Sequence, residues 1–186
     1  RGFIMYFSKF PTTNFENVEL LDITRKAKLD RLVKESALAY MNYTVQDGER
    51  PEDVAYFYYD DPAYAWLVLA SNDIVDPYTD WPKTDKDLVE NLKVKYASQA
   101  NATGEAVLEW TKNATIGANI VHYRSHIDPD IKLNRASYIN TPTSEFYPVR
   151  VYDYEVELNE ARKEIVLVNK GFLPTIQDQL SELINA

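Results

Sequence analysis

A dense run of turn residues and aromatics at residues 43–82 constrains the fold more than any other part of the chain. An Asp47-Gly48 turn follows β-favouring residues, and Pro51 then stands where a first helical turn tolerates a missing N–H. Asp61-Pro62 caps and opens a second helix in the same way. The run therefore predicts a strand, a tight turn, two short helices and an exit at Trp81-Pro82. Because the second helix is apolar nearly all round, we expect it to pack between the first helix and neighbouring strands.

The flanking segments carry weaker patterns. Before the run, the sequence predicts an apolar arm at residues 1–17, an extended segment at 18–29, a short helical turn at 30–36 and a strand at 37–45. After it, the sequence predicts a helix from Thr84 to about Tyr96, a loop at 97–105, a short helix at 106–111, a strand at 120–124 and a long surface connection at 125–148. Residues 149–168 fit both helix and strand, and we favour a helix to about Arg162 followed by a strand. Pro174 opens a final helix whose apolar stripe contains Leu180 and Ile184.

Together these elements predict an α+β fold organised as three consecutive regions. Residues 1–37 form an N-terminal arm and extended segment, residues 38–83 a compact module, and residues 84–186 a helical and mixed C-terminal region. A chain of 186 residues can bury one core of reasonable size, so two fully separate domains are not expected.

Composition narrows the classes of function. The formal net charge of −9 disfavours nucleic acid and anionic membrane surfaces as main partners. The absence of cysteine excludes disulfides, thiol catalysis and cysteine zinc sites. No apolar run approaches the roughly 20 residues that a membrane helix needs, which predicts a soluble protein. The 14 tyrosines are typical of chains that bury surface against other proteins.

The residue types that carry catalysis do not form a recognisable constellation. His122 and His126 are four residues apart, which suits a metal on a helix, but the segment is predicted as a strand, where the rings would lie about 13 Å apart. Paired carboxylates are abundant and would allow an acidic glycosidase, although nothing in the sequence places two of them across a cleft. No Gly-x-Ser-x-Gly elbow or phosphate-binding glycine loop is present in the sequence. We therefore expect no enzyme activity, cofactor or metal, and an interaction role remains.

The central run resembles a lysin-motif (LysM) module, a βααβ unit of similar length. Tyr43-Thr44-Val45-Gln46 followed by Gly48 resembles its opening, and Asn72-Asp73-Ile74-Val75-Asp76-Pro77 resembles its exit from the second helix. The likeness implies a LysM-like βααβ module at about residues 38–82. Where a glycan-binding module continues with a glycine and a closing strand, this chain has Trp81-Pro82 and a helix.

That variant is more similar to the baseplate wedge protein 53 family of contractile-tailed phages. The matching residues are Arg50-Pro51-Glu52, Asp80-Trp81-Pro82, Val121-His122-Tyr123, the run from Tyr154 to Ala161 and the aromatic arm Tyr6-Phe7-x-x-Phe10-Pro11. The resemblance implies a structural subunit of the virion tail baseplate, assembled in the host cytoplasm. It would contact other wedge proteins and a sheath-initiator-like protein, and clamp neighbouring wedges in several copies, six being the symmetry of such baseplates.

The expected partner interface comprises Tyr6, Phe7, Phe10, Tyr78, Trp81, Leu180 and Ile184. The alternative function is a LysM-type peptidoglycan-binding module of a tail or lytic protein, in which Tyr78 and Trp81 would meet the sugar.

Overall fold

The computed structural model describes residues 12–15, 18–21, 39–138, 140 and 143–177. The chain is a mixed α+β protein and divides into two compact units. Unit 1 comprises the described residues of the ranges 1–81 and 162–186, and unit 2 comprises those of the range 82–161. Unit 2 is thus inserted, in sequence, into unit 1.

Unit 1 is built on a two-stranded antiparallel sheet. β3 (Tyr40–Thr44) pairs with β7 (Glu164–Val168), with Tyr40 opposite Val168. Two further backbone bonds, from Val45 N to Lys163 O and from Asn169 N to Ala39 O, extend the ladder at both ends. The strand that pairs with β3 therefore comes from late in the sequence and not from the residues that directly follow Trp81.

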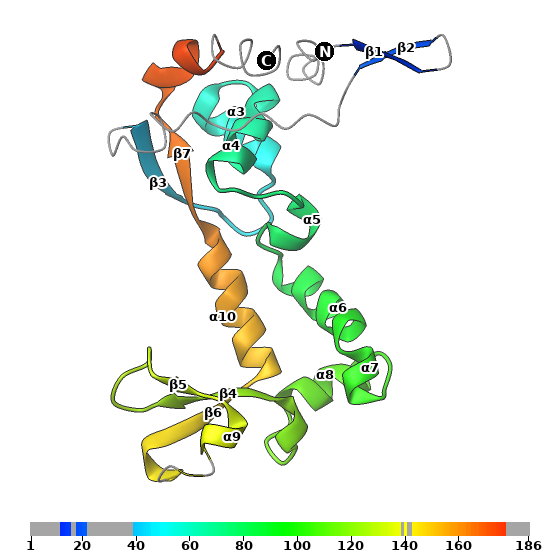
Figure 1. Ribbon diagram of the computed structural model, residues 1–186, viewed down its shortest axis with the longest axis vertical. Helices are drawn as coiled ribbons and strands as arrows, with labels where there is room; N and C mark the ends of the chain where they lie inside the picture. Colours follow the sequence, from blue (N-terminus) through cyan, green and yellow to red (C-terminus); the bar gives the residue numbers. More distant parts are fainter. Residues whose placement is uncertain (1–11, 16–17, 22–38, 139, 141–142, 178–186) are drawn as a thin grey trace. The chain divides into compact units, whose positions relative to one another are not determined.

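The helices of unit 1 follow β3 in sequence. They are α3 (Pro51–Tyr59), η2 (Pro62–Tyr64), α4 (Ala65–Ser71) and α5 (Pro77–Asp80), and η5 (Lys170–Phe172) follows β7. Figure 1 shows α3 and α4 beside the β3–β7 pair, and α4 contacts both α3 and β7. Residues 173–177 are also helical.

The turn chemistry read from the sequence explains these helix boundaries. Gly48 has a φ of 78°, a conformation that a glycine adopts without steric cost. The side chain of Asp53 accepts a hydrogen bond from Arg50 N, and that of Asp61 accepts one from Ala63 N, so each helix start has a carboxylate cap. Asp76 caps α5 in the same manner by accepting from Tyr78 N.

The core of unit 1 lies between the helices and the sheet. Its buried side chains come from α3, α4, β7, the two residues that flank β3, the residue after α5 and the helical residues 173–177. They are Ala39, Val45, Val54, Ala55, Tyr59, Leu67, Val68, Trp81, Ile165, Leu167, Val168 and Ile176. The expected packing of the apolar second helix against the first helix and a strand is confirmed.

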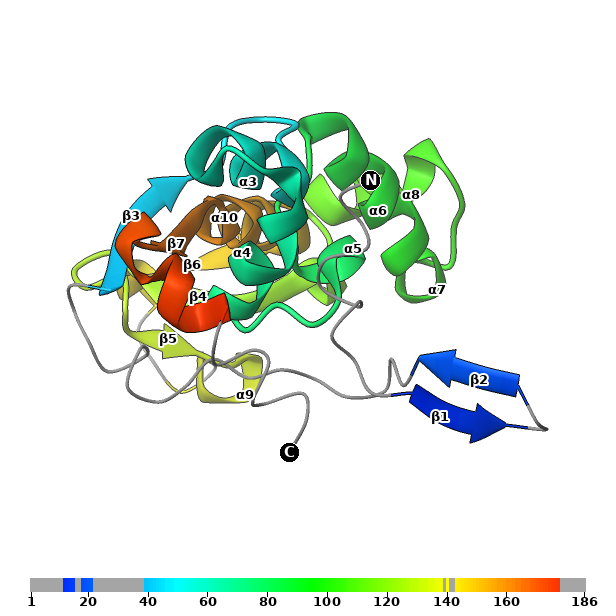
Figure 2. The same ribbon diagram turned by 90° about the horizontal axis from the view of Figure 1, so that it is seen from above.

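Unit 2 combines three helices with a small antiparallel sheet. The helices α6 (Asp85–Lys95), α8 (Glu105–Lys112) and the first part of α10 (Val151–Lys163) surround a core of Leu88, Leu92, Tyr96, Val107 and Val151. The sheet has the order β5-β4-β6, from β5 (Lys132–Leu133), β4 (Ile120–Ser125) and β6 (Phe146–Arg150). Short helical turns connect these elements: α7 (Ala97–Ala100), η3 (Gly117–Asn119), α9 (Arg135–Tyr138) and η4 (Thr143–Glu145). Figure 2 shows α6, α7 and α8 grouped together, and each of the three contacts the other two.

Several predictions about unit 2 and the residues that follow it are confirmed, and two are wrong. Thr84 accepts from Asp87 N and opens α6, and the change from helix to strand falls between Lys163 and Glu164. The loop expected at 97–105 contains α7. The surface connection expected at 125–148 contains β5, α9 and the start of β6, because backbone bonds such as Ser125 N to Ile131 O fold it back onto β4. Pro129 lies in the turn between β4 and β5, whereas Pro148 lies within β6, opposite Tyr123.

The predicted N-terminal arm lies largely outside the described residues. β1 (Thr12–Phe15), within the arm, pairs with β2 (Val18–Leu21), just after it, in antiparallel fashion. The start of the segment expected to be extended at 18–29 is thus a strand, and the turn expected at 30–36 is outside the described residues.

Candidate interaction surfaces

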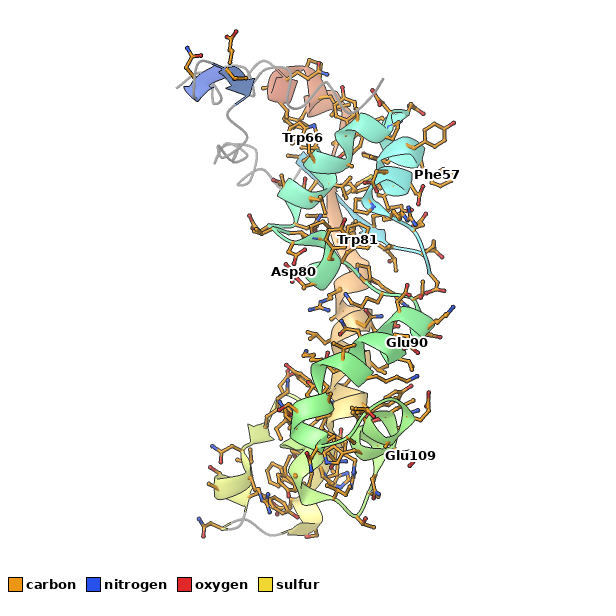
Figure 3. The ribbon with its side chains drawn as sticks, turned by 90° about the vertical axis from the view of Figure 1, so that its right-hand side faces the viewer. Phe57, Trp66, Asp80, Trp81, Glu90 and Glu109 are labelled. Atoms are coloured by element: carbon orange, nitrogen blue, oxygen red, sulfur yellow. The ribbon has the colours of Figure 1, made fainter. Side chains whose placement is uncertain are left out.

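Trp81 lies in the core of unit 1, not on its surface. Its side chain is only 6% exposed, and its indole Nε1–H donates to the carbonyl oxygen of Glu49 at 2.8 Å. The Glu49 carboxylate in turn accepts from Gln46 N and from the Tyr43 hydroxyl. Trp81 therefore joins the turn before α3 to the end of α5 (Figure 3). The sequence analysis predicted Trp81, at the Trp81-Pro82 exit of the module, as an interface residue; its indole instead completes the core.

Tyr78 has the surface position that the sequence predicted. Its side chain is 89% exposed on α5, and Val75, just before this helix, is also exposed. The five other expected interface residues, Tyr6, Phe7, Phe10, Leu180 and Ile184, lie outside the described residues. Ile176, at the start of the same C-terminal stripe, is buried in the core of unit 1. Tyr78 thus remains a predicted interface residue.

The outward face of α3 carries exposed aromatics that sequence reasoning did not select. Tyr56 and Phe57 are 58% and 68% exposed, and their ring centroids lie 5.9 Å apart in an edge-to-face arrangement. Figure 3 shows Phe57 pointing away from the ribbon. The helical pattern could have identified both, because the buried residues of α3 are Pro51, Val54, Ala55 and Tyr59, and positions 56 and 57 fall on the other side.

Unit 2 presents an apolar side chain of its own at a turn. Ile127 is 85% exposed between β4 and β5. The turn is held by the Ser125 hydroxyl, which accepts from the backbone N–H groups of Ile127 and Asp128, and by Ile131 N, which donates to Asp128 O. An exposed isoleucine on a hydrogen-bonded turn is a candidate contact residue.

A shallow hollow of about 310 Å³ lies on unit 1 and is lined by Asn72, Asp73, Ile74, Asp80, Arg162, Glu164 and Ile165. Its most constrained member is Asn72, whose amide nitrogen donates to Val68 O and Val166 O and whose Oδ1 accepts from Val166 N. The amide therefore takes the place of a neighbouring strand along the outer edge of β7. The lining holds carboxylates, one guanidinium and neither histidine nor hydroxyl side chains, a set that does not by itself point to catalysis.

The two histidines do not form a metal site with each other. The His122 ring packs edge-on against Tyr154 at 6.0 Å, and the His126 ring lies 4.9 Å from Tyr147. Burial lowers the pKa of His122, and its Nε2 is buried without a hydrogen-bond partner. Among the residues that the structure describes, no group of three or more His, Cys, Asp or Glu is arranged to hold a metal ion.

The charged clusters of unit 2 link its elements to α10. Arg124 on β4 donates to both carboxylate oxygens of Glu157, and the pKa of Glu157 is lowered chiefly by this bond. The buried Glu155 accepts from the Tyr96 hydroxyl at 2.6 Å and from Lys95 at 2.8 Å, and burial together with Glu155 raises the pKa of Tyr96. These ionisable groups hold helices and strands together.

Such features are typical of a structural subunit, in which polar clusters hold the fold and exposed apolar side chains meet other chains. A comparison with family models identifies the particular family: the model described as base plate wedge protein 53 matches residues 3–125. The chain belongs to this family of phage baseplate proteins, and its place is the tail baseplate of the virion. A search of curated proteins found no significant match. In the part of the chain that the structure describes, no helix has the length and apolar character needed to cross a membrane.

Proposed function

We propose that this chain is a non-catalytic clamp that joins neighbouring wedges of a contractile phage baseplate. The observation that carries the proposal is the division into two separately packed units, each with exposed large apolar side chains. Unit 1 offers Val75 and Tyr78, and unit 2 offers Ile127. A chain with two such surfaces can hold two neighbours at once. Once the first surface is bound, the second surface meets its partner at a high local concentration, which favours the second contact.

The partners that suit this role are other wedge proteins and a sheath-initiator-like protein, with six copies per particle. The predicted arm residues Tyr6, Phe7 and Phe10 and the last helix, with Leu180 and Ile184, would extend the contacts of unit 1. A clamp that holds one arrangement of wedges more tightly than another contributes to the free-energy difference between the resting and contracted baseplate.

The LysM-like character of unit 1 belongs to the same proposal. A β-strand, two helices and an antiparallel strand occur in that order along unit 1, with unit 2 inserted before the last strand. The burial of Trp81 and its bond to Glu49 argue against the peptidoglycan-binding alternative, because a buried indole cannot stack on a sugar ring. We therefore infer that the LysM-like unit serves assembly here.

The test compares baseplate assembly with two single variants, Tyr78→Ser in unit 1 and Ile127→Ser in unit 2. Each variant should still bind single wedges, because one surface remains intact, but should fail to join wedges into rings on a sucrose gradient. Wedges that close into complete rings without this chain, or with both surfaces altered, would refute the clamp. Micromolar binding of the full chain to purified peptidoglycan would favour the alternative.

A further inference from the structure

The outward face of α3 combines two aromatic rings with carboxylates. Glu52 and Asp53 stand one helical turn before Tyr56 and Phe57, and Asp60 ends the helix on the same side. These five side chains are all exposed, whereas the opposite side of α3 is buried in the core. The face is defined here as the α3 acidic-aromatic face.

The rings are unusual because they are adjacent, large and directed away from the core. Tyr56 and Phe57 contact each other edge-to-face, so each ring partly fixes the orientation of its neighbour. Aromatic side chains held in this way are the residue type that most often supplies binding energy in protein interfaces. Neither ring is needed to fill the core of unit 1, whose α3 members are Val54, Ala55 and Tyr59.

The charges around the rings determine which partner fits. Carboxylates on both sides of two π faces attract cations, and Lys or Arg side chains bind such rings through the cation–π interaction. Unit 1 itself contains an example beside this face: Lys170 Nζ lies 2.8 Å from Asp60 Oδ2 and 5.5 Å from the centre of the Tyr58 ring. An acidic or purely apolar partner would bring no cation to the Glu52 carboxylate.

We propose that the α3 acidic-aromatic face docks a Lys- or Arg-bearing segment of another baseplate chain. The proposal rests on the proposed function only in that the partner is a baseplate protein. The cationic heads meet Glu52 and the ring faces, while the aliphatic stems of the same side chains cover Tyr56 and Phe57. Specificity comes from the pairing of a ring with a carboxylate one turn away, which neither a neutral nor an acidic segment satisfies.

The experiment measures binding of the full chain to wedges purified from cells infected with a phage that lacks this gene. We expect Phe57→Ala to weaken binding about ten- to thirtyfold, as for truncation of an interface hot spot. Phe57→Leu should weaken binding nearly as much as Phe57→Ala does, because leucine keeps the apolar area but removes the π face. Glu52→Lys should weaken binding and reduce its dependence on salt, since it removes an attraction that salt screens. Glu109→Lys reverses an exposed helical carboxylate of unit 2 and serves as the matched control, with no change expected.

A second measurement identifies the chemistry of the partner. Placing the photo-cross-linking residue p-benzoylphenylalanine at position 57 keeps an aromatic ring and should capture a peptide that contains Lys or Arg near the cross-link. Full binding by Phe57→Leu, or a captured peptide that is acidic or uncharged, would overturn the proposal. If Tyr78→Ser weakens binding to wedges while no α3 variant does, the inference fails and the clamp stands. If the unaltered chain does not bind wedges at all, the proposed function fails with it.

Discussion

The strongest test of the fold is the substitution Asn72→Ala. Asn72 follows α4, and its amide makes three hydrogen bonds: two with the backbone of Val166 on β7 and one to Val68 O on α4. Because Val45 N bonds to Lys163 O and Asn169 N bonds to Ala39 O, the alternation of an antiparallel ladder directs the N–H and C=O of Val166 away from β3. The Asn72 side chain is therefore the partner of that backbone position.

The magnitude follows from these bonds. Each hydrogen bond contributes about 1 kcal/mol net, so the loss of three gives about 3 kcal/mol. The adjoining hollow is open, and water entering it can replace part of the interaction, which lowers the expected loss to about 2 kcal/mol. For a chain of this size that corresponds to a decrease in the unfolding midpoint of roughly 4–8 °C.

The assay combines denaturant unfolding with amide hydrogen exchange. Asn72→Ala should lower the unfolding free energy and remove the protection of the Val166 N–H. Asn42→Ala is the matched control, because Asn42 is exposed and stands opposite Val166 on β3; surface substitutions of this kind change stability by less than about 0.5 kcal/mol. Equal effects of the two substitutions, or unchanged protection of Val166 in Asn72→Ala, would refute the claim that a side chain completes this edge of the sheet.

Three further predictions concern the pH dependence of stability and the buried indole. The folded pKa of His122 is below its ordinary value of 6.5, so the unfolded chain binds the proton more readily and stability should fall as pH drops below about 6.5. The unfolding midpoint should therefore change less between pH 7 and pH 5 in His122→Phe than in the unaltered chain. Arg124 lowers the pKa of Glu157, so the contribution of Glu157 to stability is present above the ordinary pKa of 4.5 and is lost as pH falls through the pKa of the folded state. Glu157→Gln should make stability below pH 4.5 less sensitive to acid. An unchanged dependence of stability on pH would contradict this. Trp81→Phe should lower the unfolding free energy by about 1–2 kcal/mol in urea, since it removes the bond to Glu49 O and part of a buried ring, and a loss under about 0.5 kcal/mol would contradict its core role.

Local turn chemistry made much of the fold predictable. Pro51, Asp61-Pro62 and Thr84 each sit at a helix start in the structure, because a proline or a capping side chain acts within a few residues of its own position. The helix ending near Arg162 and the strand after it were also readable, from four-residue spacing that gives way to a continuous apolar run.

Long-range pairing and solvent exposure were not predictable in the same way. Nothing in the sequence near Tyr43 indicates that β3 pairs with residues 164–168, because strand pairing depends on which edges meet in space. Trp81 illustrates the same limit. A tryptophan side chain suits an interface as well as a core, and only the position of the Glu49 carbonyl in space shows that this indole belongs to the core. The exposure of Tyr56 and Phe57, by contrast, follows from the helical spacing of the buried residues of α3.

The late position of β7 in the sequence has a consequence for synthesis on the ribosome. The 80 residues of range 82–161 are made after α3, α4 and β3 and before β7. At ribosomal rates of roughly 5–20 residues per second, this interval lasts about 4–16 seconds. During it, Leu67 and Val68 have no β7 to cover them, while unit 2 receives its whole sequence and can complete its own core. The inserted unit is therefore expected to fold first, and the last strand to be synthesised then closes the unit that was begun earliest.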